Sequence, residues 1–147
     1  MNEKAHRLAT AIDHVGVAVP DLDAAIEFYR DTFGLELAHV ETNEEQGTRE
    51  AMMRVPGDDG TGTAIQLLAP LGPDTPIGKF LERKGPGIQQ LALRVTDAQA
   101  ASDQLRAKNL QVLYENPKPG TENSKANFVH PKSTGGVLLE IVEPAAD

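Results

Sequence analysis

Two strand-helix segments of this chain are near copies of each other, and this repeat constrains the fold more than any other feature. Residues 14–25 match residues 90–101 at an offset of 76, and residues 65–68 match residues 139–142 at an offset of 74. Each of the four matching strands carries one polar side chain among apolar ones: His14, Gln66, Gln90 and Glu140. A duplicated module closed around a pseudo-twofold axis would bring these side chains together.

Composition narrows the class of protein. At 147 residues, with 39% hydrophobic and 24% charged residues, the chain fits one globular domain. The net charge of −8 argues against a nucleic-acid binder, which needs a basic face, and favours a small-molecule ligand. Because the chain has no cysteine, any metal must be held by nitrogen and oxygen ligands.

The hydropathy pattern contains no membrane segment. The first seven residues are polar and lack the apolar core of a signal peptide, and no later apolar run is long enough to span a bilayer. We therefore predict a cytoplasmic protein with neither membrane nor nucleic-acid partners.

The pattern in the first half of the chain predicts a βαβββ unit. Alternation over 11–19 predicts a strand with His14 and Gly16 on one face and valines on the other. Helical spacing of apolar residues follows, with Asp21 as N-cap and Gly34 as C-terminal stop. Three further strands are predicted at 35–41, 48–55 and 62–69, separated by turn-rich segments.

The second half repeats this order after a linker helix at about 75–85. We predict a strand at 88–95, a helix at 97–108, and strands at 110–114, 125–130 and 136–142. The polar, turn-rich loop at 115–124 is expected to border a ligand mouth.

These elements predict an α+β fold class within a single domain over 1–147. Module 1 covers about 10–70 and module 2 about 87–143. The two tandem βαβββ modules would form a curved mixed sheet, with helices on its outer face and a cavity inside.

The four polar strand residues are the candidate site. Their strands are apolar on the helix side, so alternation directs these side chains toward the cavity. A buried polar group without a partner costs roughly 1–3 kcal/mol, so the four need either a hydrogen-bond network or a metal. One imidazole, two amide oxygens and one carboxylate suit Co²⁺, Mn²⁺, Mg²⁺, Ni²⁺ or Zn²⁺, and the spacing does not choose among them.

The chain resembles the methylmalonyl-CoA epimerase family of the vicinal oxygen chelate superfamily from Ile12 to Val142. The resemblance rests on five stretches taken together: Ile12-Asp13-His14-Val15, Glu45-Gln46-Gly47-Thr48-Arg49-Glu50, Ile65-Gln66-Leu67-Leu68-Ala69-Pro70-Leu71, Gly87-Ile88-Gln89-Gln90, and Asn127-Phe128-Val129-His130-Pro131-Lys132 through Gly136-Val137-Leu138-Leu139-Glu140.

The resemblance implies a divalent metal, Co²⁺ first among the candidates, with His14, Gln66 and Glu140 as ligands. Gln90 takes the fourth ligand position, where many relatives carry a second histidine. Glu50 occupies the position of a catalytic carboxylate. It shares a strand face with Thr48 and Met52, a register that could direct it into the cavity.

The function implied is interconversion of the 2R and 2S epimers of methylmalonyl-CoA, a coenzyme A thioester, through a metal-stabilised enolate. Two acid/base groups would flank the α-carbon, and we assign Glu50 and Glu140 to these roles. A homodimer is also implied. The alternatives are a glyoxalase-type lyase or isomerase, a dioxygenase, which is disfavoured because it usually requires two histidines and one carboxylate, and an antibiotic-binding protein of the same fold.

Overall fold

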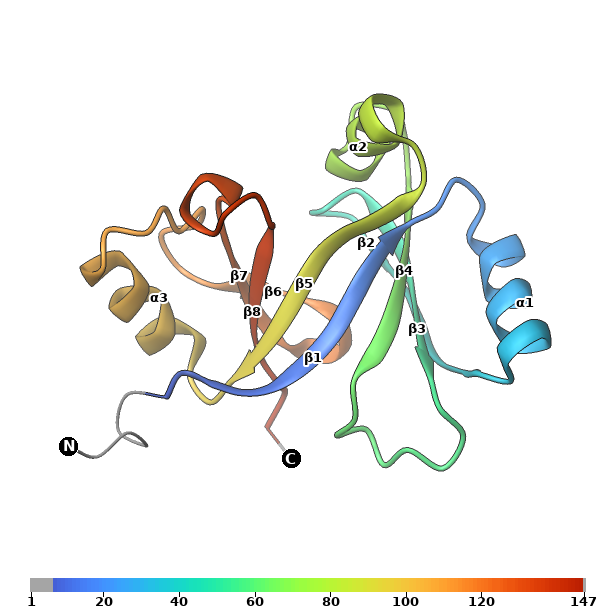
Figure 1. Cartoon of the computed structure of the whole chain (residues 1–147), viewed down its shortest axis with the longest axis horizontal. Coiled ribbons are helices and arrows are strands. Elements are labelled where there is room, and N and C mark those ends of the chain that lie inside the picture. Colours follow the sequence, from blue (N-terminus) through green and yellow to red (C-terminus); the bar gives the residue numbers. More distant parts are fainter. Residues whose placement is uncertain (1–6, 147) are drawn as a thin grey trace. The chain divides into compact units, whose positions relative to one another are not determined.

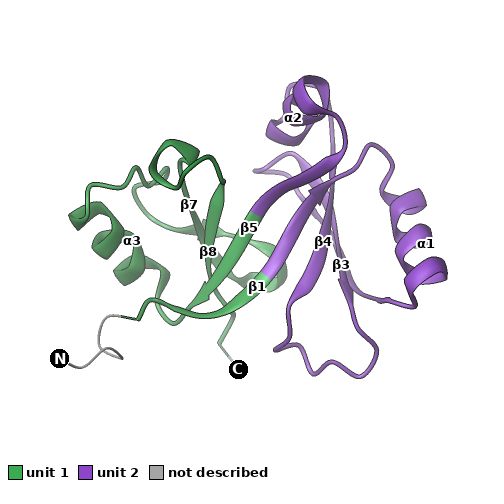
Figure 2. Ribbon diagram, viewed as in Figure 1, with its two compact units in different colours: residues 1–13, 91–147 green, residues 14–90 purple. Residues whose placement is uncertain are grey.

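The computed structural model describes residues 7–146 and contains two compact units (Figure 2). Unit 1 comprises Met1–Asp13 and Leu91–Asp147, and unit 2 comprises His14–Gln90. The boundaries fall inside two strands, β1 (Ala9–Ala18) and β5 (Gly87–Val95), each of which contributes to both units.

Unit 2 contains the elements of the first repeat and the linker helix. After β1 come α1 (Leu22–Phe33), β2 (Glu36–Asn43), β3 (Thr48–Arg54), β4 (Ala64–Pro70) and α2 (Pro76–Lys84) (Figure 1). Its strand order is β2-β3-β4-β1-β5, with β1 and β4 parallel and the β2–β3 and β3–β4 pairs antiparallel. The predicted strand-helix-three-strand order is confirmed for this half.

Local signals set the limits of α1 as predicted. A carboxylate oxygen of Asp21 accepts a hydrogen bond from the Ala24 backbone N–H at 3.0 Å, and the helix ends at Gly34 with φ 73°. Leu22 and Ile26 are buried in a core with side chains of β3 and β4, which include Met53. The helix therefore covers one face of these strands, and the polar residues of the alternating pattern lie on the other.

Unit 1 contains the second repeat. Its described elements after β5 are α3 (Ala98–Ala107), β6 (Lys118–Pro119), the 3₁₀ helix η2 (Thr121–Asn123), β7 (Lys125–Val129), the 3₁₀ helix η3 (Pro131–Ser133) and β8 (Leu139–Glu143). The strand order is β1-β5-β8-β7-β6. Ala98 and Ala101 of α3 pack against Val95 and Ile141, so the second helix also covers an apolar strand face.

Strand register shows that the two repeats are structurally equivalent. In unit 2, Gly16 pairs with Gln66 across the parallel β1–β4 ladder. In unit 1, Ala92 pairs with Glu140 across the parallel β5–β8 ladder. Gly16 and Ala92 each lie two residues after the polar residue that begins the repeat, so the duplication read from the sequence is preserved in the pairing of the strands.

The predicted strand at 110–114 is wrong. Only an isolated bridge between Val112 and Val129 forms in this segment, and the short β6 follows it. At Tyr114 the Asn127 side chain stands where a strand partner would: its oxygen accepts from the Tyr114 N–H at 3.1 Å, and its nitrogen donates to the Tyr114 carbonyl at 3.0 Å. A side chain thus takes the backbone groups that a strand partner would have bound.

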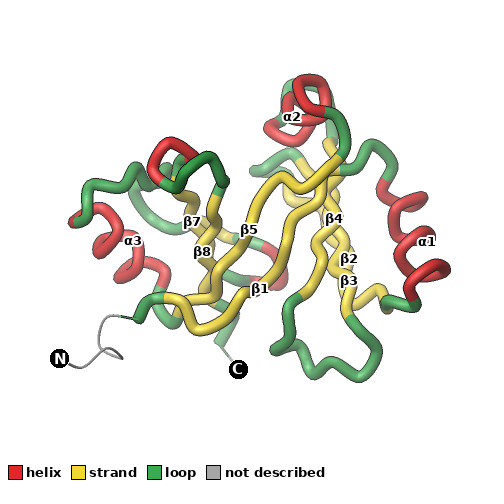
Figure 3. The backbone as a smooth tube through the Cα atoms, in the orientation of Figure 1, coloured by secondary structure: helices red, strands yellow, loops and turns green. Residues whose placement is uncertain are grey.

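The last strand begins later than predicted, at Leu139 rather than at residue 136. Gly135 and Gly136 have φ of 75° and 101°, and the Gly136 N–H donates to the Pro131 carbonyl at 2.8 Å, so these residues form a turn. Turns and loops of this kind separate the strands in Figure 3. Across residues 7–146, no helix combines the length and the apolar character that crossing a bilayer requires.

Candidate functional site

A buried carboxylate is the centre of the polar cluster in unit 2. Glu50 is 6% exposed, and both of its oxygens accept hydrogen bonds. The Thr48 hydroxyl donates to Oε1 at 2.8 Å, and the Gln66 side-chain nitrogen donates to Oε2 at 3.0 Å. Antiparallel pairing of β3 with β4 places Met52 opposite Gln66 and Glu50 opposite Leu68, so Glu50 and Gln66 lie diagonally across the ladder.

A second amide extends this network. The Gln90 side-chain nitrogen donates to the Gln66 side-chain oxygen at 3.4 Å, and both residues are buried. Gly16 gives Gln90 the space to do so: a Cβ at this position would lie 2.5 Å from the Gln90 Cγ. The hydrogen bonds run in one direction, from Gln90 to Gln66 and from Gln66 to Glu50.

His14 lies on the same face of β1 as Gly16, two residues before it, and is 3% exposed. Because Gly16 pairs with Gln66, His14 is close along the sheet to this amide. Unit 2 therefore brings together three predicted metal ligands, His14, Gln66 and Gln90, with the predicted base Glu50.

The fourth predicted ligand, Glu140, belongs to unit 1. It lies on β8 between Ala92 of β5 and Phe128 of β7, and it is 8% exposed. Its burial agrees with an inward-facing position on its own sheet, as the alternation in the sequence predicted.

The donor chemistry of the cluster fits a divalent cation. Gln66 directs its nitrogen to Glu50, which leaves its oxygen as the amide atom on the side of Gln90. Between residues 7 and 146 no three His, Asp or Glu side chains form a metal-holding group by themselves, so a site here would require the glutamine oxygens. An imidazole and amide oxygens are acceptable ligands for mid-sized divalent ions.

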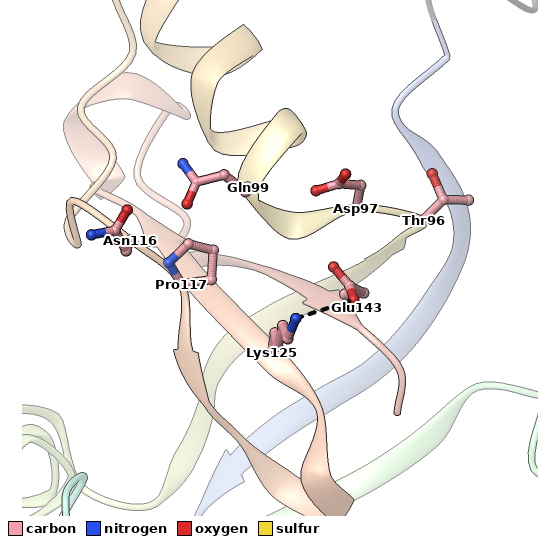
Figure 4. A pocket seen from close by; sticks show the side chains of 7 residues that line it. All are labelled: Thr96, Asp97, Gln99, Asn116, Pro117, Lys125 and Glu143. Atoms are coloured by element: carbon pink, nitrogen blue, oxygen red, sulfur yellow. Dashed lines mark ion pairs between the residues drawn. The ribbon is translucent and has the colours of Figure 1, made fainter. Parts of the chain in front are cut away.

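A separate pocket of about 480 Å³ lies within unit 1 (Figure 4). Asn116 and Pro117 of the turn-rich loop line it, as do the start of α3 and the ends of two strands: Thr96, Asp97, Gln99, Lys125 and Glu143. Two charged side chains of the pocket have partners within the protein. Lys125 Nζ lies 4.0 Å from a Glu143 oxygen, and the Ala98 N–H donates a hydrogen bond to Glu143 at 2.9 Å.

Sequence reasoning missed two residues that shape the cluster. The sequence pattern places Thr48 on the strand face of Glu50 and Gly16 on the strand face of His14, and it indicates a role for neither. Position i+2 on a strand could have suggested a Thr48–Glu50 contact, and a glycine amid valines could have signalled a close approach by another chain segment.

Comparison with known proteins identifies the family. Residues 13–128 match the glyoxalase/bleomycin resistance protein/dioxygenase superfamily. The ethylmalonyl-CoA/methylmalonyl-CoA epimerase of Cereibacter sphaeroides is 36% identical over 132 residues, which cover 88% of this chain and 95% of that protein.

Solved structures agree in fold and in sequence. The methylmalonyl-CoA epimerase of Mycobacterium tuberculosis is 52% identical with a TM-score of 0.89, covering 95% of this chain and 91% of that one. A methylmalonyl-CoA epimerase in complex with methylmalonyl-CoA and NH₄⁺ is 43% identical with the same TM-score, covering 95% and 97%. These matches confirm the predicted fold class. The chain belongs to the glyoxalase/bleomycin resistance protein/dioxygenase superfamily and, within it, to the methylmalonyl-CoA epimerase family.

Proposed function

We propose that this chain is an isomerase that interconverts (2R)- and (2S)-methylmalonyl-CoA. The observation that carries this function is the buried, doubly hydrogen-bonded Glu50 in a fold shared with an epimerase that holds methylmalonyl-CoA. The same likeness, at 43–52% identity over nearly the whole chain, outweighs the lyase, dioxygenase and antibiotic-binding alternatives.

Epimerisation requires a proton to leave one face of the α-carbon and another to arrive on the opposite face. As the C–H bond breaks, its electron pair moves into the thioester carbonyl and forms an enolate. A carboxylate on one side accepts the proton, and a carboxylic acid on the other side supplies one. We assign Glu50 to one side and Glu140 to the other.

The surroundings of Glu50 suit a base. A carboxylate has about four lone-pair directions, and the hydrogen bonds from Thr48 and Gln66 use one on each oxygen. These two donors fix the carboxylate plane, and its burial reduces competition from water for the substrate proton.

A divalent ion would be held by His14, Gln66, Gln90 and Glu140. When bound, it would supply positive charge next to the thioester oxygen, where negative charge develops. We propose Co²⁺ as the first ion to test and Mn²⁺, Mg²⁺, Ni²⁺ and Zn²⁺ as the others.

Proton NMR in deuterated water tests substrate, reaction and metal together. Wild-type protein freed of metal and then given Co²⁺ is expected to exchange the α-hydrogen of methylmalonyl-CoA and to interconvert the epimers. Glu50→Gln and Glu140→Gln should each abolish interconversion, whereas Glu36→Gln, at an exposed position on β2, should not. Full epimerisation by Glu50→Gln would refute the two-base assignment.

The proposed assembly is a homodimer of single-domain chains in the cytoplasm. The family resemblance supports the dimer, and sedimentation equilibrium would test it by the measured mass of the particle.

A further inference from the structure

Thr48 is the side chain in the cluster to which no chemical role has been given. It is 3% exposed, at the first position of β3, and its hydroxyl donates to Glu50 Oε1 at 2.8 Å. A buried hydroxyl bound to a carboxylate is a charge-assisted hydrogen bond, and such bonds are roughly twice as strong as neutral ones.

The backbone around Thr48 is held firmly. Thr48 pairs with Asn43 of β2 and with Pro70 of β4. Directly before it, the Gly47 carbonyl accepts from the Leu71 N–H at 2.9 Å.

The space where a side chain of residue 47 would lie is also occupied. A Cβ on Gly47, whose φ is 70°, would lie 2.5 Å from the Thr75 methyl carbon, so Thr75 occupies this space. Thr75 is itself the N-cap of α2. The Thr48 hydroxyl therefore projects from a fixed point and can hold the carboxylate in one orientation.

Two donors hold Glu50 from different directions. Gln66 comes from the neighbouring strand, and Thr48 comes from the same strand two residues earlier. With Gln66 alone, the carboxylate could rotate about its last side-chain bond while keeping one hydrogen bond. With both donors present, any rotation breaks a hydrogen bond, so the carboxylate keeps one orientation. A base needs such a fixed orientation to lie within hydrogen-bond reach of the proton that it removes.

We propose that Thr48 is a positioning residue for the epimerase reaction: its hydroxyl orients the Glu50 carboxylate toward the substrate α-proton. The inference rests on the proposed role of Glu50. It predicts that the hydroxyl, and not the methyl group, of Thr48 is required.

The test compares Thr48→Val and Thr48→Ser with the wild type under saturating metal. Thr48→Val keeps the shape and removes the hydroxyl, and it should lower kcat about tenfold with KM within about twofold, because an orientation effect acts on the chemical step. Thr48→Ser should remain within about threefold of wild type. Thr42→Val, at an exposed position of β2, is the matched control and should match wild type.

Exchange with solvent separates positioning from a general structural effect. In deuterated water, Glu50→Gln should stop α-hydrogen wash-out from the epimer whose proton faces Glu50 and spare wash-out from the other. Thr48→Val should slow wash-out from that same epimer only. A loss of packing would slow both.

A double variant completes the design. In the Glu50→Gln background, Thr48→Val should change the remaining wash-out less than about twofold, because the group that it orients is gone. The proposal is overturned if Thr48→Val equals wild type, if Thr48→Ser is as impaired as Thr48→Val, or if Thr48→Val slows both epimers equally. A fully active Glu50→Gln would instead refute the base assignment itself.

Discussion

At the scale of single residues, Gly16 decides where the Gln90 amide lies. Replacing Gly16 by alanine would put a methyl group 2.5 Å from the Gln90 Cγ and 3.1 Å from a Leu68 methyl carbon. Because the site is buried and Leu68 belongs to a packed core, we expect Gln90 to move away from Gln66. Epimerase activity should fall by roughly ten- to a hundredfold, the cost typical of a displaced site group.

Gly72→Ala is the control for this substitution. Gly72 has no heavy atom within 4 Å of the Cβ position and does not have a positive φ, so the change adds the same methyl group without a clash. Steady-state kinetics of both variants would check the prediction. Equal activity of Gly16→Ala and wild type would show that the Gln90 position is not critical.

Asp59, in the loop between β3 and β4, has a pKa below its usual value. The main cause is the hydrogen bond from the Thr61 hydroxyl, with a second one from the Thr61 backbone N–H at 3.0 Å. A lowered pKa in the folded state stabilises the protein above the unfolded pKa, and this contribution is lost as the pH falls through the folded value. Thr61→Val should raise the Asp59 pKa toward the ordinary value, as measured by carbon NMR titration of the carboxyl group. An unchanged pKa would exclude the hydroxyl as its cause.

The residues predicted from sequence were those that violate a simple pattern. His14, Gln66, Gln90 and Glu140 are polar on apolar strands, and the structure buries all four. Thr48 violates nothing, because threonine is common in strands, and Gly16, although unusual among valines, does not tell which segment approaches it. Their importance comes from atoms brought near by strand pairing, which a one-dimensional pattern does not contain.

At the scale of elements, the Asn127 side chain replaces part of a strand. It is fully buried on β7, holds both backbone groups of Tyr114, and donates to the Ser102 hydroxyl of α3 at 3.0 Å. The sequence predicted a strand at 110–114, a segment that includes Tyr114. The competing partner is a side chain 13 residues later in the chain, so local propensity could not reveal it.

This network predicts a large loss of stability for Asn127→Ala. The substitution would take the acceptor from the Tyr114 N–H and one of the donors from the Tyr114 carbonyl, which also accepts from the Arg106 guanidinium, and it would remove the donor to the Ser102 hydroxyl. A buried polar group that loses its partner costs about 1–3 kcal/mol. We expect a decrease of about 2–4 kcal/mol in the free energy of unfolding by urea. Asn116→Ala, at an exposed position, should change it by less than about 0.5 kcal/mol. Similar values for the two variants would contradict a structural role for Asn127.

At the scale of the whole molecule, the two units differ from the two repeats. The repeat boundary lies near the linker helix, but the unit boundaries lie inside β1 and β5. Unit 2 takes residues 87–90 from the second repeat, and unit 1 takes residues 9–13 from the N-terminal end of the first strand. Neither repeat alone contains all the strands of one unit.

Shared strands predict that the units unfold together. Within unit 1, Arg94 of β5 and Asp13 of β1 form an ion pair at 2.8 Å, with 17% and 14% of their side chains exposed. If unit 2 unfolded, β1 would lose residues 14–18 and β5 residues 87–90 from the sheet, and their remaining residues in unit 1 would fray from the new strand ends. We therefore expect one cooperative transition for the chain.

The two tyrosines allow a direct measurement, since the chain has no tryptophan. Tyr29 lies on α1 in unit 2, and Tyr114 lies in unit 1. In Tyr114→Phe the remaining fluorescence reports unit 2, and in Tyr29→Phe it reports unit 1. Circular dichroism reports the unfolding of the whole chain, and it is recorded for each variant because the substitution itself can change the stability. The urea transitions followed by fluorescence and by circular dichroism should coincide in both variants, because β1 and β5 contribute residues to both units. If the units unfold separately, the fluorescence midpoint will precede the circular dichroism midpoint in one variant and follow it in the other. That result would contradict a single cooperative transition.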